Sequence, residues 1–363
     1  MNKRLIKIAA LGSISLLLLS LTACESVQFY SQAVKGHSQI MLKRKPITEV
    51  IKAPDTNDKV RNKLAIIQRA RLFAIDKLKL PNNGSYTQYS DIERPYAVWN
   101  VIATKAYSTA PIQHCFPVAG CVSYRGYFSK TAAEEHANKL KNQGYDAIVR
   151  GAAAYSTLGW FSDPVLNTML NRSDLSLAGL VFHELAHQQV YQAGDTAFNE
   201  SFATAVELAG VDAWAAQQTS TPTQQQSLKA YRHSKQINAD VVALVLKHRK
   251  LITAAYKATP QDDHAQLAEV KQKGFDDLRA AYKTLRANGG GSKGYDRWFA
   301  QPLNNASLVL FGDYHGWVGA FETLLTQSNG DWTLFYKKVE AMTKLNKAER
   351  KTQPQQLESG SGT

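Results

Sequence analysis

Residues 173–207 read SDLSLAGLVFHELAHQQVYQAGDTAFNESFATAVE, and this stretch predicts two consecutive helices. Ser173 or the aspartate after it can cap the first helix, whose apolar residues recur at helical spacing until Gly194 ends it. The second helix begins at about Asn199 and extends to about Gln218. Because the segment between them is short, we expect a tight turn that brings the two helices together in antiparallel orientation.

The first of these helices contains the pattern His183-Glu184-x-x-His187. Two histidines four residues apart lie on one face of a helix, so both imidazoles can reach one ion. Glu184 can reach the water-bearing position of that ion as a general base. The pattern therefore predicts one catalytic Zn²⁺ per chain, because burying these groups in an apolar helix without a metal would be unfavourable. A half-exposed amphipathic helix, with Gln188 and Gln192 on its polar face, is the alternative interpretation.

A carboxylate that could complete the zinc site follows on the second helix. The run Asn199-Glu200-Ser-Phe-Ala is similar to the Asn-Glu-Gly-Phe-Ala run of gluzincin aminopeptidases, in which this glutamate is the third zinc ligand. The resemblance implies that Glu200 binds zinc with His183 and His187, across a connection shorter than in those enzymes. Glu207 is the alternative ligand; if Glu200 binds the zinc, we expect Glu207 to support a ligand from behind or to bind the substrate amine.

A wider resemblance rests on the Cys24 segment, residues 115–127 and 151–161, the two helices above and the stretch Asn304-Asn305-Ala-Ser-Leu. Together these segments resemble a family of bacterial lipoproteins described as predicted aminopeptidases, and they cover most of the chain. The resemblance implies a zinc-dependent peptidase with a thermolysin-like pair of active-site helices and a peptide substrate. An endopeptidase or amidase that acts on cell-wall peptides would use the same zinc chemistry. An envelope lipoprotein that keeps zinc only for structure would have no need of Glu184.

The same resemblance suggests a group that stabilises the oxyanion. Gluzincin aminopeptidases use a tyrosine from their later helical part for this purpose. Tyr314, in the run Phe311-Gly-Asp-Tyr-His-Gly-Trp317, is the candidate in this chain. Tyr231 and His315 are the alternatives.

A substrate-binding strand is expected about thirty residues before His183. In gluzincin aminopeptidases a strand at this place pairs with the backbone of the substrate, as an edge strand can. Gly151, Ala152 and Tyr155 lie at the corresponding position and are the candidate substrate-binding residues. The segment contains no glutamate, the residue that holds the free amine of the substrate in those enzymes. It therefore does not itself predict specificity for peptide N-termini.

The N-terminal segment, residues 1–23, has the pattern of a secretory signal. Three basic residues precede the apolar run Ile8–Leu21, which is shorter than the roughly twenty residues that span a bilayer. The small residues before Cys24 resemble a lipobox, which implies a lipid on this cysteine; an ordinary cleaved signal is the alternative. Glu25 follows the cysteine, and we therefore expect a lipid anchor in the bacterial outer membrane, facing the periplasm.

Cys115 and Cys121 are the cysteines that remain after Cys24. They lie close together in a loop that contains proline and glycine. Because an exported protein meets an oxidising compartment, the pair predicts a disulfide. Metal binding by the two cysteines with His114 is the alternative.

The composition is that of a globular protein with an excess of positive charge. Of 363 residues, 44% are hydrophobic and 20% are charged, which is sufficient for a substantial core. The formal charge is +13, and the three basic residues of the signal leave 40 basic against 30 acidic residues, or +10, in the remainder. The lysines are spread along predicted helices, which favours solvated helix faces. We therefore expect no nucleic-acid partner.

The whole pattern predicts a predominantly helical α+β fold with one catalytic body over residues 24–352. Residues 24–161 are expected to form helices and a small sheet, and residues 162–352 to be mainly helical. A polar break at Thr219–Gln226 precedes a long helical hairpin around Pro260. A final helix is expected from about Trp332 to Arg350, followed by a disordered tail over residues 353–363.

Overall fold

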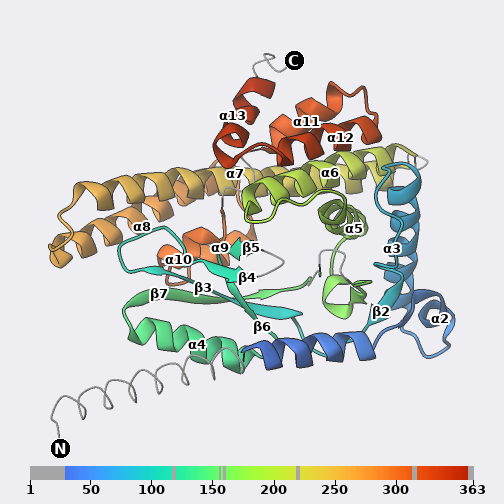
Figure 1. Ribbon diagram of the computed structural model, residues 1–363, viewed down its shortest axis with the longest axis horizontal. Coiled ribbons are helices and arrows are strands. Elements are labelled where there is room, and N and C mark those ends of the chain that lie inside the picture. The colour runs from blue at the N-terminus through green and yellow to red at the C-terminus, as the bar shows by residue number, and fades with distance from the viewer. Residues whose placement is uncertain are drawn as a thin grey trace, which may run out of the picture.

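A computed structural model describes residues 29–116, 120–154, 157, 161–217, 221–312 and 317–358. These residues form a helical body, a small antiparallel sheet and a long helical hairpin (Figure 1). The predicted α+β class with a predominance of helix is therefore confirmed. None of the helices in the described part of the chain combines the length and apolarity that a membrane span requires.

The elements follow the order expected from the sequence, with helices on both sides of the strands. Residues 29–42 are helical. The other helices are α2 (Ile47–Lys52), α3 (Asp58–Asp76), α4 (Lys130–Asn142), α5 (Asp174–Gln189), α6 (Thr196–Gln217), α7 (Pro222–Ala258), α8 (His264–Ala287), α9 (Lys293–Phe299), α10 (Asn305–Val309), α11 (Val318–Thr326), α12 (Trp332–Thr343) and α13 (Lys347–Glu358). The strands are β1 (Lys45–Pro46), β2 (Gln88–Ser90), β3 (Val98–Lys105), β4 (His114–Phe116), β5 (Gly120–Val122), β6 (Arg125–Tyr127), β7 (Tyr145–Ala152) and β8 (Val165–Leu166).

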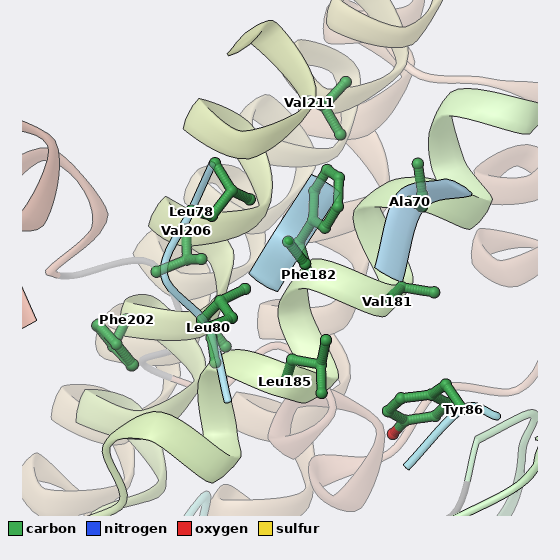
Figure 2. Close-up of a cluster of buried hydrophobic side chains, with 14 of the residues drawn as sticks. Ala70, Leu78, Leu80, Tyr86, Val181, Phe182, Leu185, Phe202, Val206 and Val211 are labelled. Atoms are coloured by element: carbon green, nitrogen blue, oxygen red, sulfur yellow. The ribbon is translucent and has the colours of Figure 1, made fainter. Parts of the chain in front are cut away.

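The main core holds α5 and α6 against the surrounding helices. Phe182 of α5 and Phe202 of α6 are fully buried, and Figure 2 shows them in one apolar cluster. The Phe202 ring centroid lies 5.7 Å from that of Phe321 in α11 and 5.9 Å from that of Phe335 in α12. Each buried aromatic side chain removes about 150–250 Å² from water, so this cluster fixes the two helices on several sides. Their polar faces are thereby held in a defined position.

The larger sheet has the strand order β6-β3-β7 and is antiparallel. Helix α4 covers one face, where Trp99 and Val101 pack against the alanines of that helix. Helix α10 covers the other face through Ala306 and Val309. Because β3 lies in the centre, β7 is an edge strand of this sheet.

The predicted helical hairpin consists of α7 and α8, the long gold helices of Figure 1. Asn305 connects the hairpin to the sheet. Its Oδ1 accepts a 3.1 Å hydrogen bond from the Tyr256 hydroxyl of α7, and its Nδ2 donates a 2.8 Å bond to the Ala106 carbonyl. Its backbone N–H donates to Asp146 of β7 at 2.9 Å. The Asn304-Asn305 stretch therefore has a structural role.

Several element boundaries differ from those expected. Helix α5 ends at Gln189 rather than at Gly194, because Val190 adopts an extended conformation. The polar segment Thr219–Gln226 is not a continuous break, because a capping box of Thr221 and Gln224 starts α7 at Pro222. The expected final helix is divided into α12 and α13, since the Asn346 side chain accepts backbone hydrogen bonds and begins a new helix. Helix α13 continues to Glu358, beyond residue 352, where we expected the folded body to end.

Candidate active site

The connection between α5 and α6 is short because Asn199 closes it. The Asn199 side chain accepts a 2.7 Å hydrogen bond from the Gln192 N–H and donates a 2.8 Å bond to the Gln192 carbonyl. Gly194 has a φ of +76°, a conformation that glycine adopts without strain. The chain therefore reverses direction between the two helices, and Glu200 lies in the first turns of α6, close to α5.

Three side chains that could bind a metal ion converge between α5 and α6. His183 Nε2 lies 3.4 Å from Glu200 Oε2, and His187 Nε2 lies 3.6 Å from Glu200 Oε1. The two imidazole centroids are 4.8 Å apart. One possible ligand atom from each of the three residues lies within 4.8 Å of the other two. These are the three ligands expected from the sequence.

The distances between the imidazole nitrogens and the Glu200 oxygens fit a shared cation better than direct hydrogen bonds. An N–H···O bond is about 2.9 Å long, whereas donors bound about 2.0–2.1 Å from a tetrahedral zinc ion lie about 3.3 Å apart. Burial lowers the pKa of His187 to about 4; the charge of His183 acts in the same direction and Glu200 opposes it. His187 is therefore neutral at pH 7 and has a lone pair to offer a metal. Two imidazoles and a carboxylate are a donor set that zinc accepts.

Glu207 lies behind His183, seven residues or about two helical turns beyond Glu200 on α6. Its Oε2 is 3.4 Å from His183 Nδ1, on the side of the ring opposite Glu200. Its Oε1 accepts a 3.0 Å hydrogen bond from the Tyr231 hydroxyl and also contacts Lys235. Burial lowers the pKa of His183, but Glu200 and Glu207 outweigh this effect and raise it to about 10. The site therefore attracts positive charge, whether a proton or a metal ion.

Gly179 makes room for Glu207. A Cβ at this position, one turn before His183 on α5, would lie 3.0 Å from both Cγ and Oε1 of Glu207. The glycine therefore permits the close approach of α5 and α6 that brings this carboxylate to the imidazole.

Glu184 faces a cavity of about 530 Å³ together with the three metal-binding candidates. We call it the metal-side cavity. Burial raises the pKa of Glu184 to about 7, an effect that His183 opposes and Glu200 reinforces. A carboxyl group with a pKa near neutrality, beside an ion site, is suited to accept and release a proton.

Tyr124 is a cleft residue that sequence reasoning missed. It follows the β4–β5 hairpin and lines the metal-side cavity with Glu184 and Glu200. Tyr124 keeps 36% of its surface exposed. Desolvation by the surrounding protein, with the charges of Glu200, Tyr191 and Glu184 acting in the same direction, raises its pKa to about 12. The phenol is therefore protonated at neutral pH and can donate a hydrogen bond into the cleft. No local pattern identifies it, because it reaches α5 only through the packing of the hairpin.

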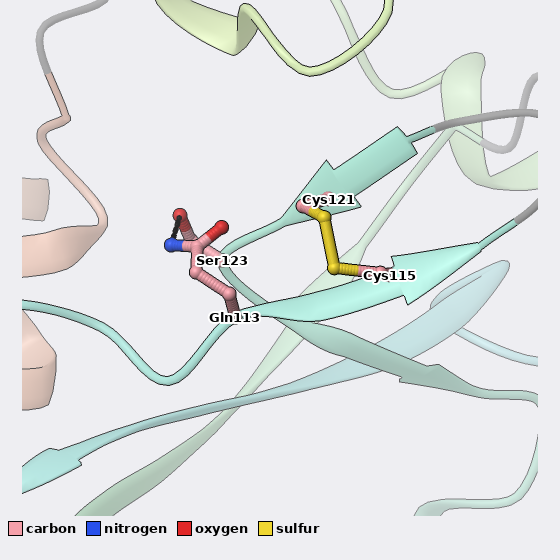
Figure 3. Close-up of a disulfide and its surroundings, with 4 residues drawn as sticks. All are labelled: Gln113, Cys115, Cys121 and Ser123. Atoms are coloured by element: carbon pink, nitrogen blue, oxygen red, sulfur yellow. Dashed lines mark hydrogen bonds between the residues drawn. A yellow bond between two sulfur atoms is a disulfide. The ribbon is translucent and has the colours of Figure 1, made fainter.

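The predicted disulfide is present and joins the two strands of that hairpin (Figure 3). Cys115 pairs with Cys121 across β4 and β5, which excludes the alternative of a metal site formed by the two cysteines. A Cβ added to Gly120, next to Cys121, would lie 2.7 Å from the Gly194 nitrogen. The hairpin therefore packs on the α5–α6 turn, which places Tyr124 beside the metal-binding candidates.

The predicted substrate-binding residues separate in the structure. Ala152, at the end of β7, lines the metal-side cavity. Gly151 lies against the Tyr96 ring instead, because a Cβ there would be 2.4 Å from that ring. Tyr155 lies outside the described residues.

Of the candidates for the oxyanion donor, the structure describes Tyr231. The Tyr231 hydroxyl bonds to Glu207, so this tyrosine lies behind His183 rather than in the cleft. Tyr314 and His315 lie outside the described residues, and their role stays a prediction. Cys24 also lies outside them.

Comparison with known proteins relates most of the chain to a protein family. A family model described as "Putative aminopeptidase" matches residues 28–353. That range includes every element of the cleft. No curated protein and no solved structure matches the chain.

Proposed function

This chain belongs to the family described as "Putative aminopeptidase", and we propose that it hydrolyses peptides with a zinc ion bound by His183, His187 and Glu200. The observation that carries this proposal is the convergence of these three donors on one side of a cavity that also contains Glu184. A zinc site used only for structure is closed by four protein ligands, whereas a catalytic site has three and an open position. Three donors beside a cavity therefore favour catalysis.

The chemistry divides between the ion and the residues around it. Zinc, when bound, lowers the pKa of water towards neutrality and polarises a carbonyl group. Glu184 accepts the proton of the attacking water and returns it to the leaving amine. Tyr124 donates a hydrogen bond to the carbonyl oxygen as negative charge develops on it. Glu207 fixes the orientation of His183 through Nδ1.

Family membership favours aminopeptidase over endopeptidase specificity. Glu207, which we considered for binding the substrate amine, already contacts His183, Tyr231 and Lys235. Its charge is therefore engaged behind the zinc ligands. Hydrolysis of a peptide with a free N-terminus, but not of the same peptide with an acetylated N-terminus, would support the exopeptidase assignment. Equal rates on both would support the cell-wall endopeptidase or amidase alternative.

We also propose that the protein is anchored to the outer membrane through a lipid on Cys24. The helical residues 29–42 begin only a few positions after this cysteine. Tyr30 and Ala33 of this helix line the metal-side cavity. The cleft would thus lie near the membrane surface, since each extended residue spans at most about 3.6 Å. Substitution of Cys24 by serine should release the protein from the membrane fraction; unchanged retention would refute the lipid anchor.

The function is tested by separating metal binding from turnover. Glu184→Gln should keep about one zinc per chain and lose about 10²–10⁴-fold in kcat, because only the general base is removed. His183→Ala should lose the metal as well as the activity. Tyr124→Phe should lower kcat with little effect on zinc content. Wild-type activity in Glu184→Gln would refute the catalytic proposal.

A further inference from the structure

A second, larger cavity of about 800 Å³ adjoins the metal-side cavity. Its lining includes Arg150 of β7, Thr204 of α6 and Arg297 of α9, and we call it the basic cavity. Glu200 lines both cavities, so the two meet at a metal-binding candidate. A ligand bound at the metal site can therefore extend into the basic cavity.

The spacing of lining residues along β7 and α6 indicates how far apart the two cavities are. On β7, Ala152 lines the metal-side cavity and Arg150 lines the basic cavity. Alternate residues of a strand point to the same face and are about 6.6 Å apart. On α6, Glu200 lies at the junction and Thr204, one turn further along, lines the basic cavity. A helical turn rises about 5.4 Å. Both measures place the basic cavity one or two peptide residues from the reaction site.

Among the described residues, the two arginines of the basic cavity have no ion-pair partner. Arg150 and Arg297 are exposed, and neither forms a salt bridge or a side-chain hydrogen bond within the part of the chain that the structure describes. Glu200 is the carboxylate in the described lining, and a bound cation would engage its charge. The two guanidinium groups are therefore available to a ligand, and guanidinium binds carboxylate in a two-pronged arrangement.

We propose that the basic cavity binds a carboxylate of the peptide substrate, which makes peptides with a negative charge within about two residues of the scissile bond the preferred substrates. The inference rests on the proposed peptidase function. Strand β7 orients the peptide substrate, because it is an edge strand of its sheet and an extended peptide can pair with it. A peptide on this edge places a group beside Arg150 when its reacting carbonyl lies near Ala152. The C-terminal carboxylate of a short peptide and an acidic side chain share the required chemistry.

The test compares three tripeptides with the zinc-loaded enzyme: trialanine with a free C-terminus, its C-terminal amide, and the amide with glutamate as the last residue. We expect kcat/KM to be about three- to tenfold higher for a charged peptide than for the neutral amide, because exposed ion pairs contribute modestly. The charged peptide that is hydrolysed faster than the neutral amide shows whether the cavity binds a C-terminal carboxylate or an acidic side chain. Equal kcat/KM for all three peptides would overturn the proposal.

Variants assign the preference to the arginines. Arg150→Gln and Arg297→Gln should each reduce the ratio of charged to neutral kcat/KM, and the double variant should bring it close to one. Arg69→Gln is the matched control, because Arg69 is an exposed arginine of α3 that lines neither cavity. A preference that persists in the double variant would refute the assignment.

A binding measurement separates this inference from the proposed function. Calorimetry with the zinc-loaded Glu184→Gln variant should show tighter binding of the charged tripeptides than of the amide, even without turnover. If wild-type protein hydrolyses none of the peptides but this difference remains, the peptidase proposal fails and the carboxylate site stands. If the affinities are equal and hydrolysis is normal, the peptidase proposal stands and the carboxylate site is refuted.

Discussion

Replacing Glu207 by glutamine should weaken zinc binding without removing a zinc ligand. The glutamine keeps the size of the side chain but loses the negative charge that faces His183 Nδ1 at 3.4 Å. A carboxylate in this position fixes the ring and makes the opposite nitrogen a stronger donor. Loss of such a partner typically reduces metal affinity about 10–100-fold, which corresponds to about 1.4–2.7 kcal/mol.

The loss of zinc affinity in Glu207→Gln can be compared with the losses in two further variants. Glu200→Gln removes the carboxylate that lies between both imidazoles, so it should reduce zinc affinity more than Glu207→Gln does. Tyr231→Phe removes only the 3.0 Å hydrogen bond to Glu207 and keeps its charge. Its effect should be about 1 kcal/mol, or about fivefold in affinity. The expected order of loss is thus Glu200, then Glu207, then Tyr231.

The assay is a competition titration of each variant against a chromophoric chelator at pH 7, with near-ultraviolet circular dichroism as the control for folding. A larger loss for Glu207→Gln than for Glu200→Gln in folded proteins would mean that Glu207, not Glu200, is the third ligand. Unchanged affinity in both would refute the metal site altogether.

Other perturbations follow from the packing around the site. Gly179→Ala should lower zinc affinity although no polar group is lost, because its Cβ would meet Glu207 at 3.0 Å; an unaltered chelator titration would contradict this. Replacing both Cys115 and Cys121 by serine should cost about 2 kcal/mol by the chain-entropy relation for so short a loop, seen as a lower Tm, and an unchanged Tm would count against it. Phe202→Ala should cost about 3–5 kcal/mol in urea denaturation, and a loss below 1 kcal/mol would refute the packing described for α6.

The sequence by itself determined the features that depend on neighbouring residues. His183 and His187 lie on one face of α5 because helical spacing alone places residues four apart together. The helical pattern of the following segment also placed Asn199 and Glu200 on the next helix. The short connection between the helices limited how far Glu200 could lie from the histidines. The disulfide was predicted from two cysteines close together in a chain whose N-terminal residues have the pattern of a secretory signal.

Only the tertiary structure decided the contacts between segments that are distant in the chain. Glu207 supports His183 because Gly179 lets α5 and α6 approach closely, a property of the helix crossing that no periodicity reveals. Tyr124 enters the cleft because a hairpin packs on the α5–α6 turn. Arg150 and Arg297 line one cavity although a strand and a distant helix carry them. Spacing encodes the face of an element, whereas the partner of that face is set by the packing of the whole core.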